Sequence, residues 1–176
     1  MKLEIPEPLR LREEAISAAL RRAAETGGQT AEAAELLESI LLPHLAKERV
    51  DVLEPLGLLP RLAAGEVCPE MAEVLPQIKQ LVSDLRDLRV EHATVLSAIK
   101  RLVAAARQEG KSQQARFAER LLFRAWLDES IFSLLAILIG KWIGAKIPDR
   151  ARGGTAFETR WPLWRPRAMP DPGRFG

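Results

Sequence analysis

Six ionisable residues occupy positions where the apolar rows of the expected helices should continue, and their types suit a metal site or a buried ion-pair network. Imidazoles and carboxylates together suit iron, manganese or zinc. An arginine among them can pair with carboxylates through its planar guanidinium. Burying one such charge alone costs on the order of several kcal/mol. We therefore expect the six side chains to meet in one interior site. They are Glu13, His44, Glu48, His92, Arg124 and Asp128.

Each of these residues belongs to a row whose members recur at alternating steps of three and four, the spacing that keeps side chains on one helix face. Glu13 and His44 are 31 positions apart, and His92 and Arg124 are 32 apart, so the chain looks like one helical hairpin repeated twice. The four predicted rows are Leu9, Glu13, Ile16, Leu20, Ala23; Leu37, Leu41, His44, Glu48; Leu85, Leu88, His92, Val95, Ile99, Leu102; and Phe117, Leu121, Arg124, Asp128, Ile131, Leu135, Leu138.

The elements that would position these residues are all expected to be helices. Alanine, leucine, glutamate and arginine dominate, and no segment alternates β-branched with polar residues as a strand would. Prolines favour helix starts and glycines helix ends. They place helices at about 9–26, 30–53, 69–109 and 112–146, with a short helical turn in the connection at 54–70. Short turns between sequential helices predict an all-α, antiparallel up-down four-helix bundle over residues 6–147.

Residues 148–176 differ in composition from the expected bundle. They carry five prolines and four glycines, with no helical period, and six arginines against three acidic residues. We expect a non-helical C-terminal tail that covers its own domain or a neighbouring subunit. Basic residues beside Trp161 and Trp164 also suit nucleic acid, but we do not expect that function.

Composition and length point to one soluble domain with an apolar core. The chain has 176 residues and a formal charge of +2, with 47% hydrophobic and 28% charged residues. A single cysteine, Cys68, excludes an internal disulfide scaffold and a zinc ribbon. The N-terminus lacks the apolar run of a secretory signal, and the longest apolar stretch, 131–140, is too short to span a bilayer. We expect a cytoplasmic protein.

The fourth predicted helix is too apolar for a helix that buries only one face. Its apolar residues between positions 131 and 139 cover nearly the whole circumference, so a second surface must cover them. We expect a homo-oligomer, a dimer in the simplest case, that associates through this helix.

Several segments that carry the ionisable residues resemble the hemerythrin-like, or HHE cation-binding, family. The resemblance spans about residues 6–147. It implies an antiparallel four-helix bundle around a dinuclear non-haem iron centre, held mostly by histidines with two bridging carboxylates, and roles in binding or sensing oxygen or iron. It is carried by Pro43-His44-Leu45-Ala46-Lys47-Glu48, Pro55-Leu56-Gly57-Leu58-Leu59, Glu91-His92, and the segment 124–140.

The chain departs from that family's ligand pattern. Three positions where the family would place histidine hold Glu13, Ser17 and Arg124. Only His44, Glu48 and His92 match in kind, while Asp128 stands where the family has a carboxylate. An intact oxygen-carrying centre is therefore not expected.

Two interpretations stay open. In the first, an altered centre holds iron, manganese or zinc through His44, Glu48, His92 and Asp128, with Glu13 as a further carboxylate, and serves as a metal- or oxygen-related sensor or storage module. In the second, no metal binds, and Arg124 takes its place in a buried salt-bridge network that supports a structural or protein-interaction role. Phosphate-binding loops and hydrolase or metalloprotease motifs are absent from the sequence, which leaves enzymatic activity an open question.

Overall fold

The computed structural model describes Ile5 and residues 7–147; the side chains of residues 7–13 lie outside this description. Within that range the chain is all-α and contains no strand, as predicted. The predictions for the tail at 148–176 and for the Glu13 side chain fall outside the described residues. None of the described helices is long and apolar enough to cross a membrane.

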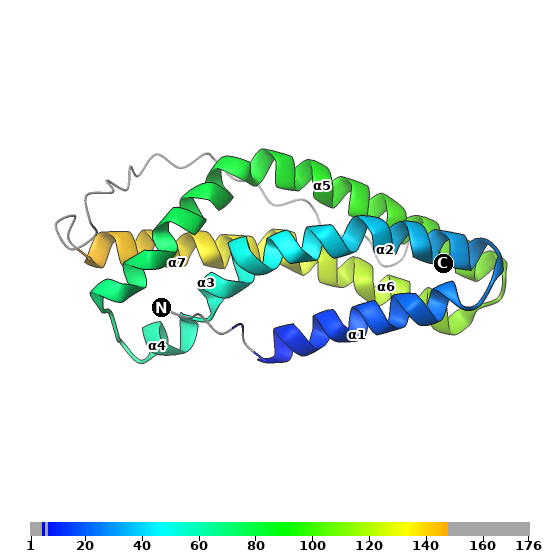
Figure 1. The fold of residues 1–176 in the computed structure, drawn as a ribbon, viewed down its shortest axis with the longest axis horizontal. Coiled ribbons are helices and arrows are strands. Elements are labelled where there is room, and N and C mark those ends of the chain that lie inside the picture. The colour runs from blue at the N-terminus through cyan, green and yellow to red at the C-terminus, as the bar shows by residue number, and fades with distance from the viewer. Residues whose placement is uncertain (1–4, 6, 148–176) are drawn as a thin grey trace.

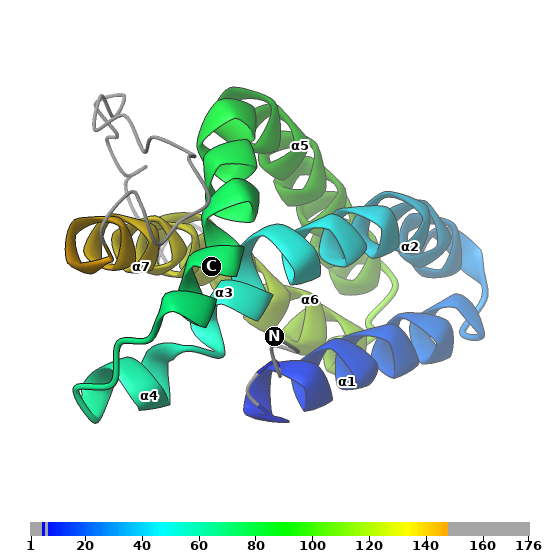
Figure 2. The ribbon, with the colours of Figure 1, turned by 60° about the vertical axis from the view of Figure 1, so that its left-hand side comes forward.

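Long helices form the body of the molecule and run in alternating directions along its long axis (Figure 1). α1 packs against α2, α2 against α5, and α5 against both α6 and α7. Both views place α1 and α7 toward opposite ends of the bundle (Figures 1 and 2). The long elements are α1 (Glu7–Ala24), α2 (Gly28–Glu48), α5 (Leu75–Gln108), α6 (Ser112–Leu127) and α7 (Ser133–Lys146).

Short elements connect the two hairpins, largely where the sequence predicts them. The expected helical turn in the connection is α4, and the helix predicted from position 69 begins with a turn of 3-10 helix before α5. The connecting elements are α3 (Glu54–Leu56), α4 (Leu59–Ala63) and η2 (Pro69–Val74).

Two π-helical turns interrupt the second and fourth long segments at corresponding places. η1 (Arg49–Leu53) follows Glu48 directly, and η3 (Asp128–Phe132) begins at Asp128. η1 thus starts directly after the pair His44/Glu48, and η3 starts at the second residue of the pair Arg124/Asp128. Single π turns inside helices occur frequently at functional sites. Their matching positions agree with the hairpin repeat that the sequence spacing indicates.

The row predicted for the fourth helix is wrong beyond Asp128. Ile131 is 39% exposed and Leu138 is 58% exposed, whereas the buried face of α7 includes Ala136 and Ile139. The cause is η3, because a π turn contains one residue more than an α-helical turn. That extra residue rotates the following face by about 100° relative to a continuous α-helix.

The apolar interior consists of two clusters. One lies among α1, α2, α5 and α6, and the other lies among η1, α3, η2, α5 and α7. Along α5, Leu88 belongs to the second cluster and Val95 to the first, and His92 stands between them. Along α2 and η1, Glu48 likewise separates Leu45 from Val52. The predicted polar residues therefore form a layer between two apolar cores.

Glu109 joins the two hairpin turns at one end of the bundle. Its carboxylate accepts hydrogen bonds from the N–H groups of Gln29 and Thr30, at 2.6 and 3.1 Å, and from the Thr30 hydroxyl at 2.6 Å. Lys111 in turn donates to the Gly27 carbonyl at 2.6 Å. A carboxylate at the N-terminus of α2 satisfies N–H groups that have no helical partner.

Candidate metal centre

His44 and Glu48 of α2 and His92 of α5 form a buried group that could hold a metal ion. One ligand atom from each residue lies within 4.8 Å of the other two. The residues are 6%, 1% and 2% exposed, respectively. Spacing explains the arrangement, because His44 and Glu48 are one helical turn apart on the face of α2 that packs on α5. His92 faces them from α5, with its ring centroid 4.5 Å from that of His44.

Glu91 fixes the orientation of the His44 ring from the neighbouring position on α5. Its Oε2 lies 3.2 Å from His44 Nδ1, and its Oε1 accepts a hydrogen bond from Lys47 Nζ at 3.1 Å. Burial lowers the pKa of His44, against the opposing effect of Glu91, and therefore favours the neutral imidazole. Desolvation raises the pKa of Glu91, but the hydrogen bonds from His44 and Lys47 outweigh it and lower that pKa overall.

The neutral ring then has one nitrogen available to a ligand. When Nδ1–H donates to Glu91, the lone pair of His44 lies on Nε2. That atom is buried and has no hydrogen-bond partner among the described residues. Metal-binding histidines commonly donate their second ring nitrogen to a carboxylate in this way. The orphaned Nε2 therefore fits a metal ligand.

Arg124 and Asp128 form a buried ion pair at the end of α6. Arg124 Nε lies 2.6 and 2.7 Å from the two carboxylate oxygens of Asp128. The guanidinium carbon lies 5.7 Å from the centroid of the Phe132 ring. Both terminal nitrogens of Arg124 are buried without a hydrogen-bond partner among the described residues. Asp128 is thus one partner of Arg124 in the interior, as a buried salt-bridge network requires, while the Glu13 side chain lies outside the described residues.

One small cavity joins these two groups. It offers about 10 Å³ to the centre of a water-sized sphere, which is about the space that one water molecule occupies. Apolar residues of α1, α2, α5 and α6 complete its wall. The polar residues that line it are His44, Glu48, His92, Arg124 and Asp128. Five of the six predicted residues thus meet at one depth in the bundle. Glu13 lies on α1 one turn before Ile16, which also lines the cavity.

No family model, curated protein or solved structure matches this chain. What is established is an all-helical bundle of long helices with a buried His/Glu/His group. The likeness to hemerythrin-like proteins rests on the sequence segments alone.

Sequence reasoning missed the part that Lys47 plays at this site. Lys47 is three residues after His44, so both side chains leave the same face of α2. A carboxylate that reaches one can therefore reach the other. Glu91, next to His92 on the facing helix, is such a carboxylate, and the structure shows it hydrogen-bonded to both His44 and Lys47.

Proposed function

We propose that this chain is a hemerythrin-like bundle that binds one divalent metal ion, namely iron, manganese or zinc, through His44, Glu48 and His92. A role as a metal- or oxygen-related sensor or storage module follows from that chemistry. The observation that supports it most strongly is the buried Nε2 of His44, which has no hydrogen-bond partner among the described residues and belongs to a ring held by Glu91. Two imidazoles and one carboxylate are a common ligand set for non-haem iron(II).

The state of Asp128 favours one ion over two. Both of its oxygens accept from Arg124, and a guanidinium keeps its positive charge at all ordinary pH values. A second ion beside it would be repelled by that charge and would compete with it for the carboxylate.

A bound ion would supply Lewis acidity and an open coordination position, or redox chemistry if it is iron. The chain's own residues prepare that site. Glu91 holds the His44 ring and sets its tautomer, while Val95, Ile99 and Leu121 exclude bulk water from the cavity. Lys47 neutralises the charge of Glu91.

Elemental analysis of protein purified without chelators tests this proposal. We expect close to one equivalent of iron, manganese or zinc per chain, and loss of that metal in His44→Ala. Glu35→Ala, an exposed change on the same helix, is the matched control and should retain the metal. Metal-free native protein that also fails to take up added Fe²⁺, Mn²⁺ or Zn²⁺ would contradict the proposal.

The alternative is a metal-free bundle with a structural or protein-interaction role. The geometry of Arg124 favours it, because a fixed positive charge already occupies part of the interior and neutralises one carboxylate. Under this alternative the core needs no metal. Native protein would contain none, and chelators would leave its melting temperature unchanged.

We also propose that the chain forms a homo-oligomer through α7 and the preceding turn. Leu138 is 58% exposed, and Ile131 and Trp142 are also exposed on this segment. Burying such side chains against a second copy would remove apolar surface from water. Analytical ultracentrifugation at micromolar concentration should show a dimer that Leu138→Glu converts to monomer. A monomeric native protein would refute the proposal.

A further inference from the structure

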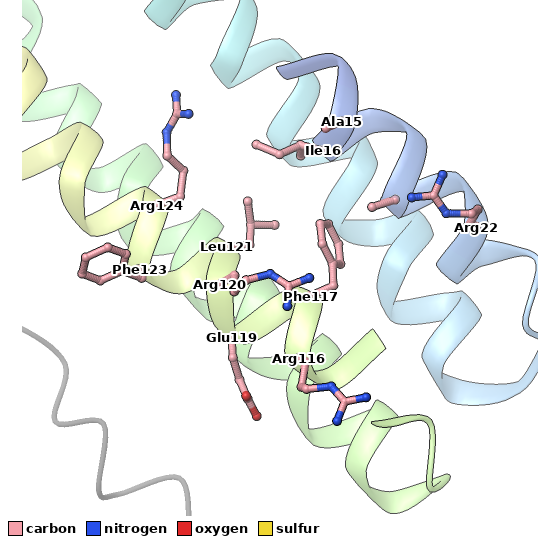
Figure 3. Close-up of a pocket in the computed structure, with 11 residues that line it drawn as sticks. Ala15, Ile16, Arg22, Arg116, Phe117, Glu119, Arg120, Leu121, Phe123 and Arg124 are labelled. Carbon is pink, nitrogen blue, oxygen red and sulfur yellow. The ribbon is translucent and has the colours of Figure 1, made fainter. Parts of the chain in front are cut away.

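A large cleft separates α1 from α6 on the outside of the bundle (Figure 3). Its volume is about 910 Å³, within the range of about 300–1,000 Å³ that small-molecule sites usually have. The cleft exists because α1 packs along α2 but touches α6 at few places. α1 and α6 are therefore only partly packed against each other.

The wall of this cleft is apolar. Phe117 and Leu121 of α6 lie opposite Ala15 and Ile16 of α1 (Figure 3). Ile16, Leu121 and Arg124 also line the small interior cavity, so these side chains lie between the cleft and the candidate metal centre. An apolar molecule lying here would cover surface that water otherwise contacts.

One end of the cleft carries positive charge without compensation. Arg22 comes from the last turn of α1, Arg116 comes from the first half of α6, and Arg120 comes from the middle of α6 (Figure 3). Because α1 and α6 run in opposite directions, Arg22 and Arg116 lie toward the same end of the cleft, and Arg120 follows Arg116 one helical turn further along α6. None of the three has an ion-pair partner among the described residues.

The other charged residues of the cleft are already paired. Glu119 accepts a hydrogen bond from Arg107 at 2.9 Å, and Arg124 is paired with Asp128. The lining that the structure describes therefore presents three unpaired cations beside an apolar wall. Arginines recognise carboxylates through paired N–H donors, and a cleft lined with one sign of charge concentrates ions of the other sign.

We propose that the cleft between α1 and α6 binds an amphiphilic carboxylate, an apolar chain of fatty-acid type that ends in an anionic head. The head lies among Arg22, Arg116 and Arg120, and the chain extends along Phe117 and Leu121. Charge complementarity argues against the basic segment 148–176 as the occupant, because six arginines against three acidic residues would meet further arginines. Binding of the carboxylate in this cleft does not require a metal ion at the His/Glu/His group.

Isothermal titration calorimetry on the full-length protein, treated with EDTA, tests this proposal with dodecanoate kept below its micellar concentration. We expect saturable binding of one molecule per chain with a micromolar dissociation constant. Acetate, which lacks the chain, and dodecylammonium, which carries the opposite charge, should bind at least tenfold more weakly.

Two pairs of variants locate the binding site. Ala15→Trp fills the cleft, whereas Ala18→Trp places the same bulk on an exposed position of α1 outside the cleft. Arg116→Glu with Arg120→Glu reverses the charge at the cleft, whereas Arg86→Glu with Arg101→Glu makes the same charge change on an exposed part of α5. Circular dichroism confirms that each variant is folded.

The cleft variants should weaken dodecanoate binding at least tenfold, and both controls should bind as the native chain does. No saturable binding to native protein would overturn the proposal. The proposal would also be overturned if the cleft variants and the control variants lost dodecanoate affinity equally. Binding of dodecylammonium as tightly as dodecanoate would overturn it as well. A loss of metal binding elsewhere in the protein would leave these results unchanged, so the two proposals fail separately.

Discussion

Arg124 donates from Nε to both oxygens of Asp128, at 2.6 and 2.7 Å, within a layer of polar side chains that separates two apolar cores. The pair lines the same cavity as His44, Glu48 and His92. Arg124 therefore binds the Asp128 carboxylate, which the sequence analysis predicts as a metal ligand. The ion pair and the His/Glu/His group are therefore neighbours in one buried cavity.

Replacing Arg124 alone should be costly. Arg124→Leu leaves the buried Asp128 carboxylate without its arginine, and breaking a buried ion pair in this way typically costs about 3–5 kcal/mol of unfolding free energy. The double variant Arg124→Leu/Asp128→Leu should recover most of that loss, since it removes both charges. Urea denaturation of the native chain, both single variants and the double variant measures the coupling. Additive single effects would contradict the paired arrangement.

Glu91 should matter to metal affinity without being a ligand. Glu91→Gln keeps the size of the side chain but removes the charge that orients His44 and pairs with Lys47. Loss of such a supporting carboxylate typically weakens metal binding about 10–100-fold. Competition titration of Zn²⁺ against a fluorescent chelator measures this change. Glu73→Gln in η2, remote from the group, serves as control, and equal affinities for all three proteins would show that Glu91 does not support a site.

Stability near one end of the bundle should depend on pH through Glu109. Hydrogen bonds from Lys111 and Thr30 lower the pKa of this carboxyl to about 2, from an ordinary value of 4.5. A carboxyl whose pKa is lowered in the folded state stabilises that state fully above pH 4.5, and the contribution is lost as the pH falls toward 2.

Thermal melts of Glu109→Gln and native protein between pH 2 and pH 7 test this. The variant should melt at a lower temperature than native protein at neutral pH, and the difference should narrow as the pH falls. Glu25→Gln, an exposed change in the other hairpin turn, is the control. A difference that stays constant over the whole pH range would show that the Glu109 carboxylate is not involved.

Close packing of α7 on α5 requires glycine at position 140. A Cβ atom there would lie 2.6 Å from Cγ2 of Ile78, a buried residue of α5. Gly140→Ala should therefore destabilise the fold by about 1–3 kcal/mol through overpacking. The penalty should shrink in an Ile78→Leu background, because leucine carries no methyl group on Cβ. A chemical denaturation midpoint for each variant measures this, and a stabilising Gly140→Ala would refute the close contact.

Much of the fold could be predicted from the sequence because its helices have clear chemical boundaries. Gly28 and Gly110 adopt positive φ at the two hairpin turns, which non-glycine residues rarely do, and so mark the ends of helices reliably. The polar layer was also predictable, since charged residues at core spacing must meet partners. Helical periodicity therefore placed His44, Glu48 and His92 on facing sides of α2 and α5.

What could not be predicted depends on departures from that periodicity and on how helices pack. The π turn at η3 shifts the register, so Ile131 and Leu138 become exposed although their spacing suggested burial. The cleft at Phe117 arises from the separation of α1 and α6, which leaves no trace in either helix alone. The contact between Arg124 and Asp128 likewise depends on side-chain geometry, which helical periodicity does not give.

The central claim is that His44, Glu48 and His92 hold one divalent ion, and the metal content of the native protein tests it most directly. Elemental analysis of native, His44→Ala and Glu35→Ala proteins purified without chelators should give about one, none and about one equivalent of iron, manganese or zinc. Binding of one ion should also raise the melting temperature of the native chain, since the ion binds the folded state. Equal metal content in native and His44→Ala proteins, or none in either after incubation with all three metals, would contradict the account.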